Sequence, residues 1–282
     1  MEIHLAKTAG FCFGVNRAVK LTYQLLDEGR RVATLGPLIH NPQVVADLQR
    51  RGAITCDSVE QVPDGCEVVI RSHGVPETVY EKIRTRGLAY HDATCPFVAK
   101  IHKIAAEAGR NGAILLVAGD RTHPEVEGIV GHATGPVVVF AGLEELQAWA
   151  AGSEPQKSIY VVAQTTFRVE SWEQCKAFLK KWCTNPKIFD TICNATWARQ
   201  QEAEDLSQKC DHMVVIGGHH SSNTQKLLQV AAKHCDAVSI ETAAELDRNW
   251  LKGAKVVGVT AGASTPSSII EEVLNCMSEE IR

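Results

Sequence analysis

The sequence predicts an α/β fold of three pseudo-threefold-related domains, each with a mostly parallel sheet flanked by helices. A cysteine recurs at one position of an internal repeat, as Cys12, Cys95 and Cys193, each between a short apolar run and a helix-like segment. Continuous Val- and Ile-rich strands alternate with helix-like segments, which is typical of parallel sheets covered by helices. A period of about 90 residues is too long for a solenoid, so we expect the repeats to pack as a trefoil around a common centre.

The third repeat illustrates the expected order of elements. Strands are expected at its apolar runs, which span residues 187–192, 212–218, 237–240 and 255–261. Helices are expected between and after them, at residues 195–208, 224–234, 242–251 and 267–277. The polar segments HHSSN and GASTP follow two of these strands, at the position where open α/β sheets bind ligands.

We place the boundaries between repeats near residues 91 and 188, just ahead of the second and third repeat cysteines. This division predicts domains of residues 1–91, 92–188 and 189–282. Each is small but long enough to form a core of its own.

Composition restricts the classes of function. The chain has 282 residues and a net charge of −4, which gives no electrostatic reason to expect a nucleic acid or an anionic membrane surface as partner. No apolar run approaches the ~20 residues of a membrane span, and the first residues lack the pattern of a signal peptide. We therefore expect a cytoplasmic protein. In that compartment, ten cysteines point to metal binding or catalysis rather than to disulfides.

Two sets of polar side chains recur together with the cysteines. The position 28 residues after each cysteine holds His40, His123 and Ser221 in turn. The loop after the next apolar run holds His73, Thr165 and Ser264. For any single one of these residues a helix cap is the simpler interpretation. Six such loops directed at one centre would instead form an anion site built from neutral donors.

Three thiolates at a common centre would form a metal site with an open position. A lone cysteine is more often a small buried hydrophobe, but the equivalence of these three favours a ligand role. Zinc can take three cysteines and a fourth ligand, whereas a [4Fe–4S] cluster with three cysteines leaves one iron without a protein ligand. The surrounding loops hold few bases strong enough for hydrolysis, so we favour the iron–sulfur cluster over zinc.

Nine motifs, spread from residue 9 to residue 266, match one known family. They are AGFCFGVNRAV, GPLIHNPQVV, RSHGVP, DATCPFV, HPEVEGI, QTT, DTICNAT, SSNT and GVTAGASTP. These motifs resemble those of the 4-hydroxy-3-methylbut-2-enyl diphosphate reductases, the last enzymes of the methylerythritol phosphate route to isoprenoids. The resemblance implies a trefoil of three α/β domains around one central [4Fe–4S] cluster per subunit. It also implies reductive removal of the C4 hydroxyl, giving isopentenyl diphosphate and dimethylallyl diphosphate.

The resemblance further implies a role for each matching residue. Cys12, Cys95 and Cys193 would hold the cluster, whose open iron would bind the substrate hydroxyl. Glu125 would donate protons, together with Thr165 and His123. The substrate-binding residues would be His40, His73, His123, Thr165, Ser221, Ser222, Asn223 and Ser264.

Two other functions remain open at this point. One is a cluster-dependent hydro-lyase, which would use the open iron only as a Lewis acid and consume no electrons. The other is a non-catalytic iron–sulfur sensor, against which the many polar loop residues argue. The chain contains no GxGxxG or P-loop motif, and so no recognisable nucleotide-cofactor site that would supply electrons. The resemblance implies an external electron donor such as a ferredoxin or flavodoxin. It also favours a monomer.

The remaining distinctive residues are expected to be structural. Trp172 and Trp197 fall in predicted helices, where we expect them to pack in the core. His219 and His220 directly precede the SSN segment, and we expect them to position that loop. The seven other cysteines do not repeat and are expected to be core or surface thiols.

Overall fold

The computed structural model describes residues 1–153 and 158–279 of the chain. The chain divides into two compact units, which are described separately below. The first unit comprises Met1–Asn16, Ile39–Asp47 and Asn194–Arg282. The second comprises Arg17–Leu38 and Leu48–Cys193.

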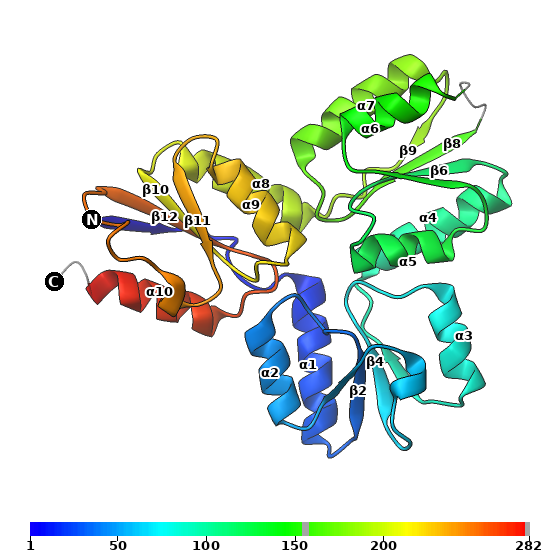
Figure 1. Cartoon of the computed structure of the whole chain (residues 1–282), viewed down its shortest axis with the longest axis horizontal. Coiled ribbons are helices and arrows are strands. Elements are labelled where there is room, and N and C mark those ends of the chain that lie inside the picture. Colours follow the sequence, from blue (N-terminus) through cyan, green and yellow to red (C-terminus); the bar gives the residue numbers. More distant parts are fainter. Residues whose placement is uncertain (154–157, 280–282) are drawn as a thin grey trace. The chain divides into compact units, whose positions relative to one another are not determined.

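The first unit contains one parallel sheet with strand order β1-β12-β10-β11. Its strands are β1 (Glu2–Leu5), β10 (His212–Ile216), β11 (Asp236–Ile240) and β12 (Val256–Ala261). Its helices are α8 (Asn194–Ser207), α9 (Ser222–Ala231), α10 (Ser267–Glu279) and the short 3-10 helix η2 (Ala243–Glu245). The helices α8 and α9 lie on one side of the sheet and α10 on the other (Figure 1).

Alternating side chains of β10 form the core on both faces of this sheet. Val215 packs with Leu227 of α9, whereas Val214 and Ile216 pack with Ile270 of α10. Because successive side chains of a strand point to opposite faces, a strand covered by helices on both sides must be apolar at every position. This requirement explains the continuous apolar run MVVI at residues 213–216.

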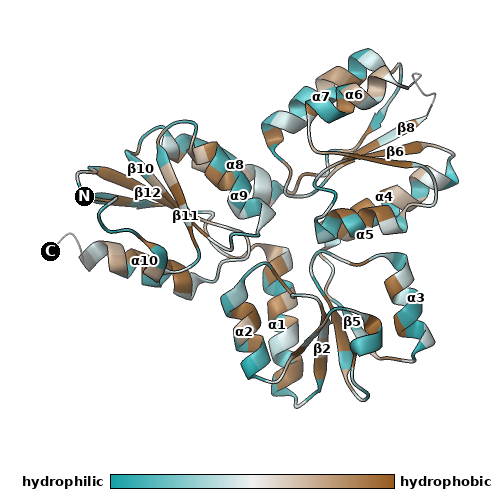
Figure 2. Ribbon diagram, in the orientation of Figure 1, coloured by the Kyte–Doolittle hydropathy of each residue, from teal (hydrophilic) through white to brown (hydrophobic). Residues whose placement is uncertain are grey.

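The second unit contains two parallel sheets with strand orders β3-β2-β4-β5 and β7-β6-β8-β9. The strands of the first sheet are β2 (Val32–Leu35), β3 (Ile54–Cys56), β4 (Glu67–Ile70) and β5 (Tyr90–Asp92). Those of the second are β6 (Ile114–Ala118), β7 (Val137–Phe140), β8 (Ile159–Ala163) and β9 (Lys187–Ile188). In Figure 2 the strands carry mostly hydrophobic residues, while the helices mix both kinds.

In the part of this unit that the structure describes, six helices surround the two sheets, together with the 3-10 helix η1 (Val59–Gln61). They are α1 (Phe13–Asp27), α3 (Glu77–Thr85), α4 (Pro96–Arg110), α5 (Pro124–His132), α6 (Leu143–Ala151) and α7 (Val169–Trp182). Two helices cross from one unit into the other. Both α1 and α2 (Pro42–Arg50) begin in the first unit and end in the second. One face of β6 packs against α4 and α5, and the other packs against α6 and α7.

The predicted α/β class with three related parallel sheets is confirmed, since every strand pairing among the described residues is parallel. The pairings also show where the strand ahead of each cysteine belongs. In each sheet it is an edge strand: β1, β5 or β9. The boundaries expected near residues 91 and 188 fall within β5 and β9, each of which completes the sheet before it. The first strand, β1, pairs with β12 near the other end of the chain.

Two local expectations were wrong. Only residues 243–245 of the segment expected as a helix at 242–251 are helical, as a 3-10 turn. The Asp247 side chain there accepts a hydrogen bond from the Asn249 backbone, and such local bonding competes with a continued helix. Trp172 is buried as expected, but Trp197 is 54% exposed because it lies on the outer face of α8.

Among the described residues, no helix is both long and apolar enough to cross a membrane.

Candidate active site

The three repeat cysteines share one backbone environment. The backbone N–H of each donates to a carbonyl in the loop that follows the neighbouring strand, always at 3.0 Å: Cys12 to Ala263, Cys95 to Ser72 and Cys193 to Thr165. Each cysteine directly precedes a helix, which is α1, α4 or α8. All three side chains are half-buried. The equivalence expected from the sequence therefore holds at the level of individual hydrogen bonds.

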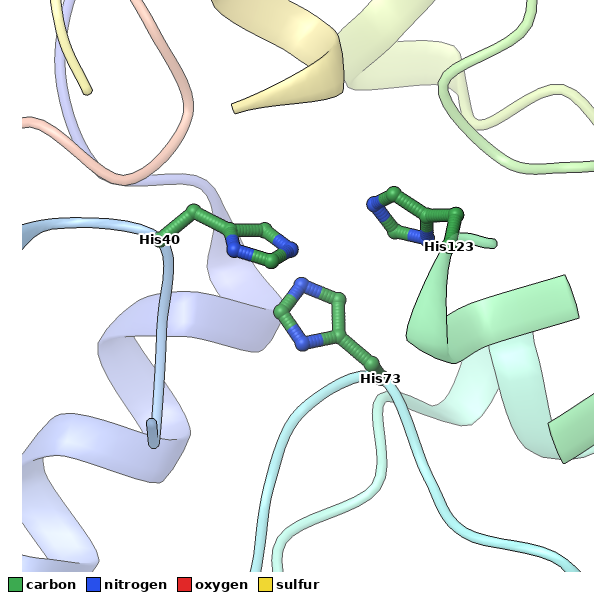
Figure 3. A group of neighbouring side chains, drawn as sticks. All are labelled: His40, His73 and His123. Atoms are coloured by element: carbon green, nitrogen blue, oxygen red, sulfur yellow. The ribbon is translucent and has the colours of Figure 1, made fainter. Parts of the chain in front are cut away.

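In the second unit, His73 and His123 lie against each other. Figure 3 shows the two rings, whose centroids are 5.5 Å apart with an edge-to-face angle of 87°. His40, also labelled in Figure 3, belongs to the other unit and is described with it below. The Nδ1 atom of His123 accepts the backbone N–H of Glu125 at 3.1 Å and thereby caps α5. This bond assigns the proton of the neutral His123 ring to Nε2, which makes Nε2 a hydrogen-bond donor.

Glu125 lies in the first turn of α5, two residues after His123, and Thr165 holds its carboxylate in place. The backbone N–H of Thr165 donates to Oε1 at 2.6 Å, and its hydroxyl donates to Oε2 at 2.7 Å. Only 2% of Glu125 is exposed. Burial raises the pKa of Glu125 to about 7, and the two bonds from Thr165 oppose this rise. The carboxyl group is therefore poised to hold or release a proton near neutral pH.

These contacts connect the predicted residues of the second unit into one continuous series. Cys95 is bonded to Ser72, which precedes His73, and His73 contacts His123. His123 is bonded to Glu125, Glu125 to Thr165, and Thr165 to Cys193. Residues that are far apart in the sequence thus meet at the carboxyl ends of β4, β6 and β8.

In the first unit, the SSN segment forms the N-terminus of α9. The Ser221 hydroxyl oxygen accepts the backbone N–H of Thr224 at 3.4 Å, so its own proton is available to another acceptor. Ser222 and Asn223 are the first two residues of the helix, where backbone N–H groups have no partner within the helix. The Asn223 side-chain nitrogen is buried, with no hydrogen-bond partner among the described residues. This end of α9 therefore suits an anion.

The two other predicted residues of this unit are adjacent to that helix end. The Ser264 hydroxyl donates to the backbone oxygen of His40 at 3.0 Å. A Cβ atom at Gly218 would lie 2.7 Å from the same oxygen, so the loops of residues 39–41, 218–223 and 262–265 pack closely. Cys12 is bonded to Ala263, directly before Ser264, which connects the cysteine to this group.

Sequence reasoning missed the side chains that hold the cysteine loops in place. Arg199 of α8 is buried and donates to the backbone oxygen of Gly10 at 2.7 Å. Glu202 accepts bonds from the backbones of Lys7 and Thr8 and from the Thr8 hydroxyl. In the second unit, Arg17 donates to the backbone oxygens of Asp92 and Thr94, just ahead of Cys95.

A possible signal for these anchors was the presence of charged residues five to nine positions after a repeat cysteine. The structure was needed to interpret it, because side-chain charge alone does not reveal a backbone partner. His219, by contrast, behaves as expected of a residue that positions its loop. Its backbone N–H donates to Glu241, and its Nε2 lies 3.0 Å from Glu245.

Comparison with known proteins supports the resemblance read from the motifs. A model of the LytB protein family matches residues 3–278. The 4-hydroxy-3-methylbut-2-enyl diphosphate reductase of Geobacter sulfurreducens is 44% identical, over 99% of this chain and 98% of its own length. The protein of the same name from Citrifermentans bemidjiense is 43% identical, over 99% and 97%.

Solved structures are similar over nearly the whole chain. One is of (E)-4-hydroxy-3-methyl-but-2-enyl diphosphate reductase, the terminal enzyme of the non-mevalonate pathway. It is 38% identical, with a TM-score of 0.70, and the match covers 99% of this chain and 100% of that one. The E-1-hydroxy-2-methyl-but-2-enyl-4-diphosphate reductase of Plasmodium falciparum is 27% identical, with a TM-score of 0.91, over 97% and 87%. The chain belongs to the LytB protein family.

Proposed function

We propose that this chain is a 4-hydroxy-3-methylbut-2-enyl diphosphate reductase, the terminal enzyme of the methylerythritol phosphate route. The reaction breaks the C4–oxygen bond of the allylic alcohol and releases water, with two electrons and two protons consumed. Its products are isopentenyl diphosphate and dimethylallyl diphosphate. The observation that carries the proposal is the matched setting of the three repeat cysteines in a chain that aligns with such reductases over nearly its whole length.

We propose Cys12, Cys95 and Cys193 as the ligands of one [4Fe–4S] cluster per subunit. The donor set fits, because thiolates are the ligands of such clusters and a helix N-terminus favours a thiolate. Other cysteines fit less well, since burial raises the pKa of Cys175 and of Cys235 to about 11 and keeps their thiols protonated. When bound, the cluster would supply electrons and an iron without a protein ligand that acts as a Lewis acid.

The residues of the second unit would carry the protons. Glu125, with its pKa near neutrality and its carboxylate fixed by Thr165, is the proposed proton donor to the departing hydroxyl. The Thr165 hydroxyl would position that oxygen and relay the proton. His123 would offer its Nε2–H to the substrate, because its Nδ1 already accepts the Glu125 backbone.

The residues of the first unit would hold the diphosphate. Ser221, Ser222 and Asn223 present hydroxyl, amide and backbone donors at the start of α9. Ser264 and His40 belong to loops packed against that helix end. In the second unit we assign His73, beside His123, to substrate binding as well.

We also propose that the electrons come from an external carrier such as a ferredoxin or flavodoxin, and that the protein is cytoplasmic and monomeric. No observation favours the hydro-lyase or the sensor over the reductase. The residues 1–91, 92–188 and 189–282 stay our proposal for the three domains.

Iron and sulfide content tests the cluster assignment. Anaerobically purified protein should contain about four irons and four sulfides per chain, with a visible spectrum that shifts when the hydroxylated allylic diphosphate is added. Serine at any one of the three repeat cysteines should reduce the iron content, whereas Cys276→Ser, a matched change at a half-buried cysteine outside the repeat set, should not. Zinc in place of iron, or full iron content in all three variants, would contradict the assignment.

A further inference from the structure

A basic stripe runs along the exposed face of α4, starting beside Cys95. Phe97 is 43% exposed, and Lys100 and Lys103 follow it at three-residue intervals, so all three side chains share one face of the helix. Residues 96–103 include no acidic residue. Neither lysine forms an ion pair with any residue that the structure describes.

The start of α1 adds a second pair of basic residues within the same unit. Arg17 and Lys20 are exposed and also three residues apart. The Arg17 guanidinium donates to the backbone oxygens of Thr94 and Asp92, at 3.0 Å each. These contacts bring the basic face of α1 to the loop that leads into Cys95 and α4. We define the basic surface by Arg17, Lys20, Lys100 and Lys103, which lie on the two helices that meet at the loop ahead of Cys95.

Nearby acidic groups offset this charge only in part. Both Asp92 oxygens are engaged internally, one with the Thr94 backbone at 2.9 Å and the other with the Tyr80 hydroxyl at 3.0 Å. Glu107, further along α4, accepts a bond from the Tyr160 hydroxyl. The chain as a whole has a net charge of −4, so a surface with four basic side chains departs from its average.

A cavity and exposed aromatic side chains lie in the same unit as this basic surface. A cavity of about 260 Å³ opens beside the stripe, lined by Tyr80, Asp92, Thr94, His102, Lys103 and His132. Phe97 and Tyr90 are exposed aromatic residues of the same unit, and the Tyr90 ring lies 6.0 Å from that of Tyr80 in the cavity wall. Aromatic side chains within a ring of charges are typical of protein interfaces.

We propose that this basic surface is the docking site of an acidic one-electron carrier protein, an inference that rests on the proposed reductase function. Each encounter would oxidise the carrier by one electron and reduce the cluster by one, and two encounters would supply one turnover. A site of electron entry must lie close to a cluster ligand, and Phe97 is two residues from Cys95. Opposite charges would steer the encounter, and redox partners form small, transient interfaces of this kind.

Charge reversal tests the proposal with two readouts. The holoprotein and its Lys20→Glu/Lys100→Glu/Lys103→Glu variant would be titrated with a purified acidic ferredoxin at low and at physiological salt, and the Kd measured. We expect the variant to bind at least about tenfold more weakly at low salt, with a flatter salt dependence. A control, Lys180→Glu/Lys181→Glu/Lys209→Glu, makes the same charge change at exposed lysines elsewhere and should bind as the wild type does.

Turnover separates this inference from the function on which it rests. Both triple variants should convert substrate normally with reduced methyl viologen, but the α1/α4 variant should slow with ferredoxin as donor. Equal ferredoxin affinity in the two variants, or no ferredoxin binding by the wild type, would overturn the docking site. Absence of viologen-driven turnover in the wild type would instead overturn the reductase function.

Discussion

The Glu125 carboxylate receives two hydrogen bonds from a single residue, Thr165: one from its backbone N–H at 2.6 Å and one from its hydroxyl at 2.7 Å. The pair joins α5 to the loop after β8, and the same loop accepts the backbone bond of Cys193. Thr165 thus connects a buried acid with a pKa of about 7, Glu125, to the proposed cluster ligand Cys193 through one hydrogen-bonded residue.

The first prediction concerns the proton donor. Glu125→Gln keeps the size of the side chain but removes its ionisable proton. Turnover should fall by about 10²–10⁴-fold, the usual effect of losing a general acid. Iron content and substrate affinity should stay unchanged. Glu127→Gln, a change at an exposed acid of the same helix, is the control. Full activity of the Glu125 variant would remove this residue from the mechanism.

The same residue should affect stability in a pH-dependent way. Its folded pKa of about 7 lies above its ordinary value of 4.5, so its stabilising contribution is fully present below pH 4.5 and is lost as the pH rises through 7. Glu125→Gln should therefore be more stable relative to wild type at pH 8 than at pH 5, by roughly 3 kcal/mol at most. Urea unfolding at the two pH values measures this, and an equal difference at both would contradict it.

Thr165 offers a test of the hydrogen bond itself. Thr165→Val removes the hydroxyl that donates to Oε2, while Thr165→Ser retains it. Because that bond lowers the pKa of Glu125, the valine variant should shift the acidic group in the pH–rate profile to higher pH and lose activity. The serine variant should restore most of both properties. Identical pH profiles for the two variants would show that the hydroxyl does not act through Glu125.

Asn223 is predicted to be a diphosphate ligand rather than a structural residue. Its side-chain nitrogen is buried with no partner among the described residues, and a bound anion would satisfy it. Asn223→Ala should raise KM by about 10- to 100-fold, the loss of one charge-assisted hydrogen bond, with little change in kcat. Folding stability should not fall, since no internal bond is removed. A large loss of stability with an unchanged KM would indicate a structural role.

Gly74 should be required for the position of His73. The Gly74 backbone has φ +73°, and a Cβ atom there would lie 2.5 Å from the His102 ring. His102 is buried behind the loop, stacked on His132 at 4.1 Å, and burial lowers its pKa to about 3. Gly74→Ala should therefore both destabilise the protein and raise KM by displacing His73.

A second glycine provides the control for backbone strain. Gly87 also has a positive φ of +62°, but a Cβ atom there would meet nothing within 4 Å. Gly87→Ala should cost only the conformational penalty of about 1–2 kcal/mol and leave KM unchanged. Equal effects of the two substitutions on both quantities would mean that the His102 contact is unimportant.

Much of the fold could be predicted because the repeat carries redundant information. Cys12, Cys95 and Cys193 identify equivalent positions, and each confirms the strand–helix order of the others. The pairing of β1 with β12 could not be predicted in this way, since periodicity describes one strand and not its neighbour. The exposure of Trp197 was missed for a related reason, because the face of α8 that lies outward depends on packing.

The site shows the same division between local and long-range information. The loops that hold His123 and Ser221 follow apolar strands, and both residues cap helices as their sequence positions suggest. The bonds from Thr165 to Glu125 join residues that are 40 positions apart, and the bond from Arg199 to Gly10 spans 189. No spacing rule predicts such bonds, because they arise only when separate elements come together.

The electron count per product tests the central claim most directly. Anaerobic protein would be mixed with the hydroxylated allylic diphosphate and reduced methyl viologen, and viologen oxidation would be compared with the products formed. The reductase function predicts two electrons consumed for each isopentenyl or dimethylallyl diphosphate, and no product without a reductant. Conversion of the substrate without viologen oxidation would contradict this function and favour a hydro-lyase.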